Sequence, residues 1–329
     1  PLWTVSDVAM GVLQRGGVVA RRCSSSLSAV YRADAALRQA HASMCLQDVR
    51  SQDWGHFMQG LLLPAPIRPS FYAVRALNAA LSTLQGHGNS DGDLMARRLR
   101  VMWWKECVDA CYTATEAQQN TLPRQPVVLQ LYEAIHTHQL PKALFDRMLR
   151  NRLEEVDGKQ PKDLTLMENY SESVHASMLY MTLLMLQSEE ETKRHAQEKL
   201  PYSLSEKARL AASHLGKAIG LTLMLRQLPY AGRDRRLLLP ATLTSKFKVS
   251  EESVFRKQDS DELRQVVFHV GDLAKAHVDE CRKYGREVRH SQRKALLSVV
   301  LAEHFLEVLE RVQFNPFDPA LFEGGRFSE

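Results

Sequence analysis

Hydrophobic residues recur every three or four positions along most of the chain, which is the spacing of an amphipathic helix. One such face consists of Phe71, Val74, Leu77, Leu81 and Leu84. The same spacing predicts one or two helices over residues 34–62 and single helices over 94–114, 163–186, 260–290 and 292–312. No stretch alternates apolar and polar residues as a half-buried strand does, and no repeat of fixed length is present. The pattern therefore predicts an all-α domain.

The segment from Ser205 to Pro240 combines a helical pattern, a basic turn and a Leu-Leu-Leu-Pro exit. Ser205 can cap the helix, because its hydroxyl can accept a backbone N–H of the first turn. Ala212, Gly216 and Gly220 recur at four-residue spacing and form a stripe of small residues along one side. Such a stripe allows another helix to approach closely. We therefore expect the rest of the chain to be organised around this helix.

The composition is that of a globular protein, with 44% hydrophobic and 25% charged residues. A formal net charge of +5 is compatible with a polyanionic partner and equally with a solvated surface that carries a small excess of arginine. No apolar run reaches the roughly 18 to 20 residues that a transmembrane helix needs. The cysteines are odd in number and scattered, which favours a reducing compartment. Cys107 and Cys111 lie one helical turn apart without a second ligand pair, so we expect them in the core.

The N-terminal residues differ in composition from the rest of the chain. They contain four arginines and a serine cluster, with Asp7 as the only acid before Asp34. This composition is typical of a mitochondrial targeting segment, and an unstructured arm is the alternative. We expect an arm over residues 1–39, a single domain over 40–322 and a short tail over 323–329.

Three segments carry a resemblance to a known family. They are QGLLLPAPIRPSFYAVRALNAAL (59–81), ENYSESVHASMLYMTLLML (168–186) and HLGKAIGLTLMLRQLPYAGRDRRLLLP (214–240). In their order and spacing they resemble the squalene/phytoene synthases. The resemblance implies the all-α terpenoid-synthase helical bundle, formed as a single domain. In the active family, arginines and carboxylates on two helices hold Mg²⁺ ions on a prenyl diphosphate.

Laid on this sequence, the family's arginines are kept and its carboxylates are replaced. The two arginines fall on Arg75 and Arg226. The carboxylate positions fall on Asn78, Ser82, Gln227 and Ala231, and residues 55–89 and 208–232 contain no Asp or Glu. Because Mg²⁺ prefers hard oxygen ligands, usually carboxylates with water and phosphate, these helices cannot hold it as the family does. The resemblance therefore implies a pseudoenzyme, with no catalytic residue, metal or cofactor.

Within the family, the sequence is most similar to the mitochondrial, non-catalytic branch that acts in complex I assembly. LLLPAPIRPSFYAVRALN, RRLLLPATL and the late segment LAEHFLEVLERVQFNPFDPAL (301–321) carry this similarity. It implies a scaffold with protein partners in a mitochondrial assembly intermediate, in the matrix. A basic strip over residues 209–248 has eight Lys or Arg against the single Asp234. Contact with rRNA during mitoribosome assembly is therefore a related alternative.

Two further alternatives remain. The arginines Arg75, Arg226, Arg233, Arg235 and Arg236 could clamp a phosphate without metal, since guanidinium groups match phosphate oxygens. The protein would then be a prenyl-diphosphate binder or residual prenyltransferase. The leucine runs 61–63 and 237–239 could instead present apolar surface to the inner membrane in peripheral association. We expect both leucine runs in the core.

Overall fold

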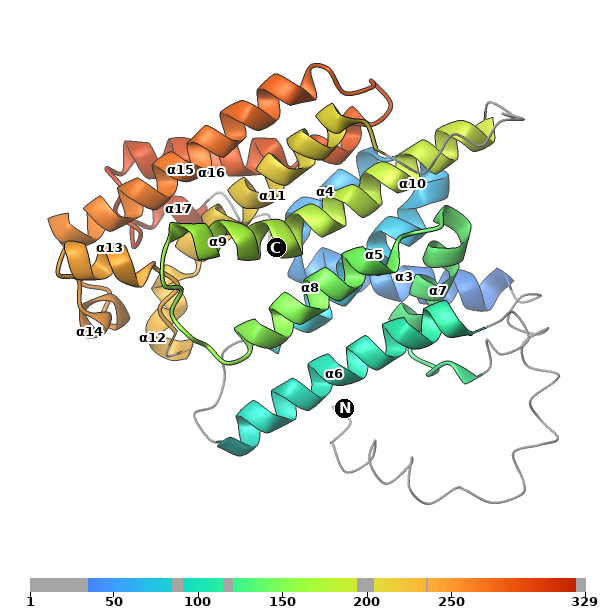
Figure 1. The fold of residues 1–329 in the computed structure, drawn as a ribbon, viewed down its shortest axis with the longest axis horizontal. Coiled ribbons are helices and arrows are strands. Elements are labelled where there is room, and N and C mark those ends of the chain that lie inside the picture. Colours follow the sequence, from blue (N-terminus) through green and yellow to red (C-terminus); the bar gives the residue numbers. More distant parts are fainter. Residues whose placement is uncertain (1–34, 85–90, 115–120, 194–203, 235, 324–329) are drawn as a thin grey trace.

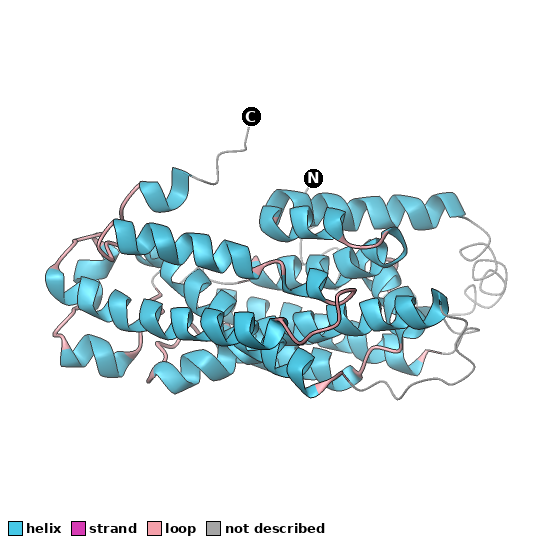
Figure 2. Ribbon diagram, turned by 90° about the horizontal axis from the view of Figure 1, so that it is seen from above, coloured by secondary structure: helices cyan, strands magenta, loops and turns pink. Residues whose placement is uncertain are grey.

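The computed structural model describes residues 35–84, 91–114, 121–193, 204–234 and 236–323. Within these ranges every regular element is a helix, and the helices pack into one elongated bundle (Figures 1 and 2). The predicted all-α class is therefore confirmed. The first described helix begins at Ala35, inside the stretch that we expected to form an arm. The other residues of the predicted arm, and nearly all of the predicted tail, lie outside the described residues.

The bounds of the helices follow the chain in two groups. The first group consists of α3 (Ala35–Gln52), α4 (Trp54–Leu62), η1 (Ala65–Ile67), α5 (Arg68–Ser82), α6 (Asp91–Thr113), α7 (Pro126–His138) and α8 (Lys142–Glu155). A long run follows, in which α9 (Leu164–Ser171) continues through the π-helical turn η3 (Glu172–Ala176) into α10 (Ser177–Lys193). The second group consists of α11 (Glu206–Arg226), η4 (Leu228–Tyr230), α12 (Ala231–Asp234), α13 (Ala241–Lys246), α14 (Glu251–Phe255), α15 (Asp261–Gly285), η5 (Arg293–Leu296), α16 (Val299–Arg311) and α17 (Ala320–Glu323).

Capping side chains and prolines set several of these helix ends. The hydroxyl of Ser205 accepts a hydrogen bond from the N–H of Ala208 at 3.2 Å, which confirms the predicted cap of α11. Asp53 and Ser260 cap α4 and α15 in the same way. Each satisfies one of the N–H groups that a first helical turn leaves without a partner. Pro64 closely follows α4, because proline cannot continue a helix.

The helices predicted over residues 260–290 and 292–312 are shorter in the structure. Between α15 and α16 the chain forms a turn and the short helix η5. The guanidinium of Arg293 donates to the backbone carbonyls of Arg286 and Val288 at 2.6 and 2.9 Å. Because a side chain satisfies these carbonyls, the chain can leave the helix without losing hydrogen bonds.

The helix α11 packs against α9, η3, α15 and α16 and is the centre of their packing (Figure 1). A methyl group added at Gly216 would overlap the backbone of Ala176 in η3, and one added at Gly220 would overlap Ser171 in α9. Only a residue without a side chain permits this approach. The close contact predicted from the stripe of small residues is therefore confirmed.

Gly216→Ala is expected to lower the free energy of unfolding by about 1 to 2 kcal/mol. Alanine gains about 1 kcal/mol of helix propensity over glycine. The overlap with the backbone of Ala176 costs more, because that backbone cannot move aside as a side chain end can. The matched control is Gly271→Ala in α15, whose new methyl group would meet nothing closer than 3.5 Å. Urea denaturation should find the control neutral or stabilised, and equal effects in both variants would contradict the close packing.

The two cysteines that lie one helical turn apart are core residues. Cys107 and Cys111 are both buried in α6, and Sγ of Cys111 donates to the carbonyl of Val128 at 3.6 Å. Burial raises the pKa of both thiols to about 12, so they stay protonated at neutral pH. Their expected packing role is confirmed.

The two leucine runs differ in their placement. Leu237 and Leu239 are buried, as expected. In the first run only Leu63 is buried, whereas Leu61 and Leu62 are 41% and 57% exposed. The expectation of core packing is wrong for these two residues, because the helix α4 turns part of its apolar face outward. No helix in the described part of the chain has both the length and the apolar character needed to span a bilayer.

Candidate functional site

Arg75, the first arginine of the predicted site, lies on the buried face of α5. Its side chain is 3% exposed, and its Nη1 lies 3.9 Å from Oδ2 of Asp53, the residue that caps α4. Oδ1 of Asp53 lies 2.7 Å from Nδ1 of His56. The Arg75 guanidinium also lies 5.7 Å from the centre of the Phe71 ring and donates to Sδ of Met178 at 3.5 Å. We call Asp53, His56 and Arg75 the first cluster.

Burial and charge act against each other in the first cluster. Burial opposes the ionisation of Asp53, but His56 and Arg75 hold the pKa of this carboxyl below its usual value. Burial lowers the pKa of Arg75 to about 10, and the charge of Asp53 opposes that shift. Both groups are therefore ionised at neutral pH. A protein carboxylate already compensates the charge of Arg75.

A second cluster is built around Glu155 at the end of α8. Its Oε2 accepts hydrogen bonds from Nη1 of Arg152, at 2.8 Å, and from the hydroxyl of Tyr170 in α9. Its Oε1 lies 3.3 Å from Nη2 of Arg236. Arg152 and Arg236 are both buried. Glu155 is thus one carboxylate shared by two buried cations, and its loss would leave them uncompensated.

Asn78 on α5 joins this second cluster. It is the first position at which the family resemblance implies a metal-binding carboxylate. Its Oδ1 accepts a hydrogen bond from Nη2 of Arg152 at 2.7 Å. Ser82, the next such position, donates its hydroxyl to the carbonyl of Ala79 in its own helix at 2.8 Å. The side-chain oxygens of both residues are therefore engaged by the protein.

The corresponding positions after α11 lie elsewhere. Gln227 is exposed at the end of the helix, and Ala231 is buried and carries no polar side-chain group. Arg226 has part of its surface exposed, and its guanidinium lies 5.9 Å from the centre of the Phe305 ring. Burial of the charged group lowers its pKa, and Tyr230 and Asp53 oppose that shift, so Arg226 extends toward the carboxylate of the first cluster. The two pairs of positions at which the resemblance implies carboxylates therefore differ in their surroundings. Asn78 on α5 is hydrogen-bonded to a buried arginine, whereas Gln227 lies at the exposed end of α11.

The structure describes four of the five predicted arginines. The structure places Arg75 in the first cluster and Arg236 in the second. Arg226 and Arg233 are exposed. Arg235 lies outside the described residues. The charge of Asp53 acts on both Arg75 and Arg226, whereas Arg236 belongs to the second cluster, so the phosphate clamp stays a prediction.

His175 is close to cations of both clusters. It lies in the π-helical turn η3 and is buried. Burial lowers its pKa well below the ordinary value of 6.5, and the charges of Arg152 and Arg75 lower it further. The ring is therefore neutral at physiological pH. A π-helical turn often marks a functional site or its remnant.

The stability of the protein is expected to fall when the pH drops below about 6.5. The unfolded chain takes up a proton at His175 near that pH, whereas the folded protein does not, because its pKa is lowered. The contribution of this group is fully present above about pH 6.5 and is lost at up to about 1.4 kcal/mol per pH unit below it. Urea denaturation between about pH 7.5 and 5.5 measures the slope. His175→Asn should make the slope shallower, and the lowered pKa values of His56, His138 and His277 should maintain the remainder. The exposed-site control His290→Asn should leave the slope unchanged; equal slopes for all three proteins would contradict the assignment.

Sequence reasoning missed the two carboxylates that organise these clusters. Asp53 comes just before the acid-free stretch that contains Arg75. Glu155 lies in a helix to which no role was assigned, far along the chain from Arg236. The contacts arise between helices that meet only in the folded protein. The only local sign of Asp53 in the sequence was its capping position before α4. That position does not show that Asp53, unlike other helix caps, pairs with a buried arginine.

Three buried donors of the two clusters lack a partner. Within the described residues, the Nε–H groups of Arg75, Arg152 and Arg236 have no hydrogen-bond acceptor. Such donors can meet an anionic oxygen. In the same described ranges, no three His, Cys, Asp or Glu side chains come together as a metal site requires. In both clusters the buried arginines are thus paired with carboxylates of the protein itself.

The basic strip over residues 209–248 is interrupted by carboxylates. Nζ of Lys217 lies 3.6 Å from Glu172 and 3.9 Å from Glu168. Arg236 is buried against Glu155 in the second cluster. The strip is therefore not one continuous basic face of the kind that meets nucleic-acid phosphates.

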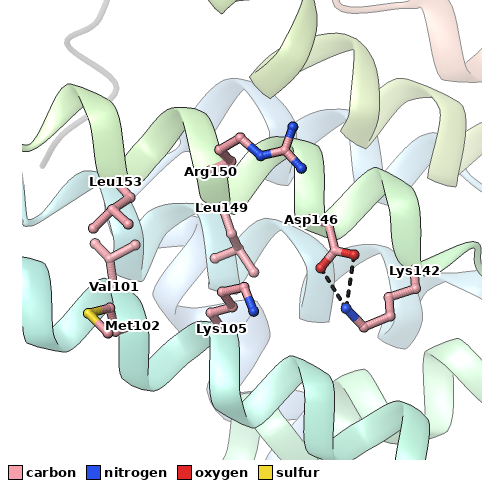
Figure 3. A pocket seen from close by; sticks show the side chains of 8 residues that line it. All are labelled: Val101, Met102, Lys105, Lys142, Asp146, Leu149, Arg150 and Leu153. Carbon is pink, nitrogen blue, oxygen red and sulfur yellow. Dashed lines mark hydrogen bonds and ion pairs between the residues drawn. The ribbon is translucent and has the colours of Figure 1, made fainter.

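A separate hollow of about 240 Å³ lies between α6 and α8 (Figure 3). Its lining is Val101, Met102, Lys105, Lys142, Asp146, Leu149, Arg150 and Leu153. Lys142 and Asp146, one turn apart on α8, form an ion pair at 2.7 Å at one end of it. None of the predicted site residues lines this hollow.

Comparisons with known proteins agree with the fold. The family model of squalene/phytoene synthase matches residues 49–327. Two solved structures share the fold: squalene synthase HpnC from Alicyclobacillus acidocaldarius, with a TM-score of 0.68 at 18% identity, and a dehydrosqualene synthase, with 0.64 at 20%. The matches cover 86% and 85% of this chain and 97% and 90% of those chains.

Relatives that are similar in sequence are named as assembly factors and not as synthases. A protein of Bos taurus, "NADH dehydrogenase (ubiquinone) complex I, assembly factor 6", is 31% identical over 277 residues. Its counterpart in Homo sapiens is 30% identical over 277 residues. Both matches cover 84% of this chain and 76% of the relative. The chain thus resembles synthases in fold and assembly factors in sequence.

Proposed function

Because the chain belongs to the squalene/phytoene synthase family, we propose that it uses the helical fold of that family as a non-catalytic factor in the assembly of mitochondrial complex I. The relatives of Bos taurus and Homo sapiens, which are named as complex I assembly factors, support the assembly function. The observation that carries the non-catalytic part is Asn78. It stands where the resemblance implies a metal-binding carboxylate, and it is hydrogen-bonded to Arg152.

The physical reason is the distribution of charge around the two clusters. Ionisation of an allylic diphosphate depends on metal ions, whose electrostatic stabilisation of the transition state is worth several kcal/mol. Here the carboxylates of Asp53 and Glu155 compensate arginines of the protein itself. A chain arranged in this way gains a stable interior and loses the means to hold metal and substrate.

The proposed location is the mitochondrial matrix, with protein partners in an intermediate of complex I assembly. The proposed functional domain spans residues 40–322. We expect Arg226, which is exposed, to meet acidic groups of a partner. The family resemblance implies a phosphate contact at this position, so the same positive charge would serve a different ligand.

Sedimentation of mitochondrial extracts tests this proposal. A tagged form of the chain is expected to sediment with an intermediate that contains complex I subunits. After salt treatment that dissociates the intermediate, it should shift to the position of the free protein. Recovery of the protein only as a free monomer, in cells that are actively assembling complex I, would contradict the proposal.

The alternative of a prenyl-diphosphate binder has one observation in its favour, namely the orphan Nε atoms of Arg75, Arg152 and Arg236. We nevertheless expect isothermal calorimetry with farnesyl diphosphate to detect no binding, with or without Mg²⁺. A diphosphate would have to displace Asp53 or Glu155 from a buried ion pair. An active synthase of the family serves as the positive control. Binding that requires Mg²⁺ would overturn the non-catalytic assignment.

A further inference from the structure

The helix α6 lies at the edge of the bundle, where it packs on α7 and α8 (Figure 1). Three large apolar side chains on its outer side, those of Met95, Leu99 and Met102, are 55%, 52% and 46% exposed. Residues that follow one another by four and then three positions lie on the same face of a helix. They therefore form one apolar stripe, which the described residues leave uncovered.

The stripe ends beside the hollow between α6 and α8. Met102 belongs to both, and Figure 3 shows Leu153 of α8 facing Val101 and Met102 of α6. Val101 and Leu149, which also line the hollow, are buried and give it an apolar floor. We call the stripe and the hollow together the α6–α8 groove.

The size of the hollow suits a side chain better than a whole small molecule. Sites for small molecules usually enclose about 300 to 1,000 Å³ and bury most of the ligand. This hollow has a volume of about 240 Å³ and continues into the open stripe. An amphipathic helix binds in such a groove through apolar residues spaced by three, four and seven positions. Met95, Leu99 and Met102 have the same spacing, so a helix of about two turns can follow them.

Charged residues of both signs surround the α6–α8 groove. Three ion pairs lie beside it, Arg98–Asp157, Lys105–Asp109 and Lys142–Asp146, with N–O distances of 2.6, 2.9 and 2.7 Å. Arg150 lines the hollow, is exposed and has no ion-pair partner among the described residues. The exposed acids Glu106 and Glu154 follow the stripe on α6 and Leu153 on α8.

This composition favours a protein as the occupant of the groove. Protein interfaces are enriched in Met and Arg and have a polar rim, and the groove has Met95, Met102 and Arg150 within a rim of mixed charge. The surfaces that an anionic membrane attracts carry clustered cations instead.

We infer that the α6–α8 groove binds an amphipathic helix of a protein partner, with a large apolar side chain of that helix in the hollow and one of its carboxylates against Arg150. Apolar side chains that fill such pockets contribute much of the binding free energy of an interface. A guanidinium group can donate two parallel hydrogen bonds to a carboxylate. The inference rests on the proposed function, because it takes the partner to be a subunit in the complex I assembly intermediate.

Sedimentation of mitochondrial extracts that contain the tagged chain tests the inference. Leu99→Glu/Met102→Glu places two charges in the groove, and both positions are exposed, so the core is kept. We expect at least about tenfold less of this variant in the fractions that contain complex I subunits, as for the loss of a binding hot spot. Arg150→Glu should lower that amount too, and Arg150→Lys, which keeps the charge, should lower it less.

The matched control is Met44→Glu/Leu166→Glu, at positions on α3 and α9 that are exposed to a similar degree. It should sediment as the unchanged chain does, and urea denaturation should find both double variants folded. If the unchanged chain and the groove variant sediment equally with complex I subunits, the inference is overturned and the proposed function stands. If the unchanged chain sediments only as the free protein, the proposed function fails and the inference fails with it.

The other possible occupants of the groove give different results. A dimer of the purified chain that Leu99→Glu/Met102→Glu dissociates would show that a second copy fills the groove. Flotation with anionic lipid vesicles that this variant loses, while it still sediments with complex I subunits, would show that the groove meets lipid. An equal loss of sedimentation in the control would show that the effect does not belong to the groove. Each of these results would overturn the inference.

Discussion

Replacing Glu155 with glutamine is expected to lower the free energy of unfolding by about 3 to 5 kcal/mol, which is the cost of breaking a buried ion pair. Glutamine keeps the shape and can still accept hydrogen bonds, but it carries no charge. Arg152 and Arg236, which are 5% and 9% exposed, would then lose their shared carboxylate. Urea denaturation followed by circular dichroism measures the change.

Glu154→Gln is the control for this prediction. It removes the same charge from the same turn of α8, but Glu154 is exposed. Surface substitutions of this kind usually change stability by less than about 0.5 kcal/mol. If the two variants were equally stable, the second cluster would not hold the interior together. A double variant, Arg152→Met/Glu155→Met, should recover part of the loss because it removes charges of both signs.

Asp53→Asn is expected to cost about 3 kcal/mol, by the same reasoning applied to the first cluster. Asparagine still caps a helix well, so the loss of α4 capping does not contribute. What changes is the charge opposite Arg75, whose side chain is 3% exposed. The pKa of Asp53 is below its unfolded value, so its contribution is present above about pH 3.8 and is lost as the pH falls further.

Two comparisons make this prediction specific. The difference between the unchanged protein and Asp53→Asn should be full at about pH 7 and shrink toward about pH 3, because the carboxyl is then neutral in the unfolded chain. Asp48→Asn, at an exposed site in the preceding helix, should have little effect at neutral pH. A constant difference across this range would mean that Asp53 acts only through its shape.

Features that depend on local spacing could be predicted from the sequence. The cap at Ser205 and the stripe of Gly216 and Gly220 follow from positions a few residues apart, and the structure confirms both. The turn held by Arg293 could not be predicted, because helical spacing continues through it. The hydrogen bonds of this turn join the Arg293 side chain to backbone carbonyls. The spacing of apolar residues carries no information about such bonds.

The candidate site was predictable only in part, for a related reason. Spacing and resemblance single out Arg75 and Asn78 on one helix. They do not reveal that Asn78 meets Arg152, 74 positions away in the sequence, at 2.7 Å. Nor do they reveal that Glu155 joins Arg152 to Arg236. The absence of acids in two stretches is visible in the sequence, but the carboxylates that compensate the remaining arginines come from other helices.

The same limit applies to the molecular surface. Leu61, Leu62 and Leu63 are adjacent and equally apolar, yet only Leu63 is buried. When one side of a helix contacts the core, three or four positions in every two turns face that core. Whether the other positions are buried depends on what packs against the opposite side of the helix. What packs on that other side comes from a segment more than 230 residues away in the sequence, because Gln59 donates a hydrogen bond to the carbonyl of Lys294.

The central claim is that this synthase fold now serves the assembly of complex I without catalysis. The most direct measurement is native electrophoresis of mitochondria from cells in which the gene has been disrupted. We predict that assembled complex I falls severely, that partial assemblies accumulate and that ATP synthase is unchanged, with recovery when the chain is expressed again. Normal amounts of assembled complex I in the disrupted cells would contradict the account.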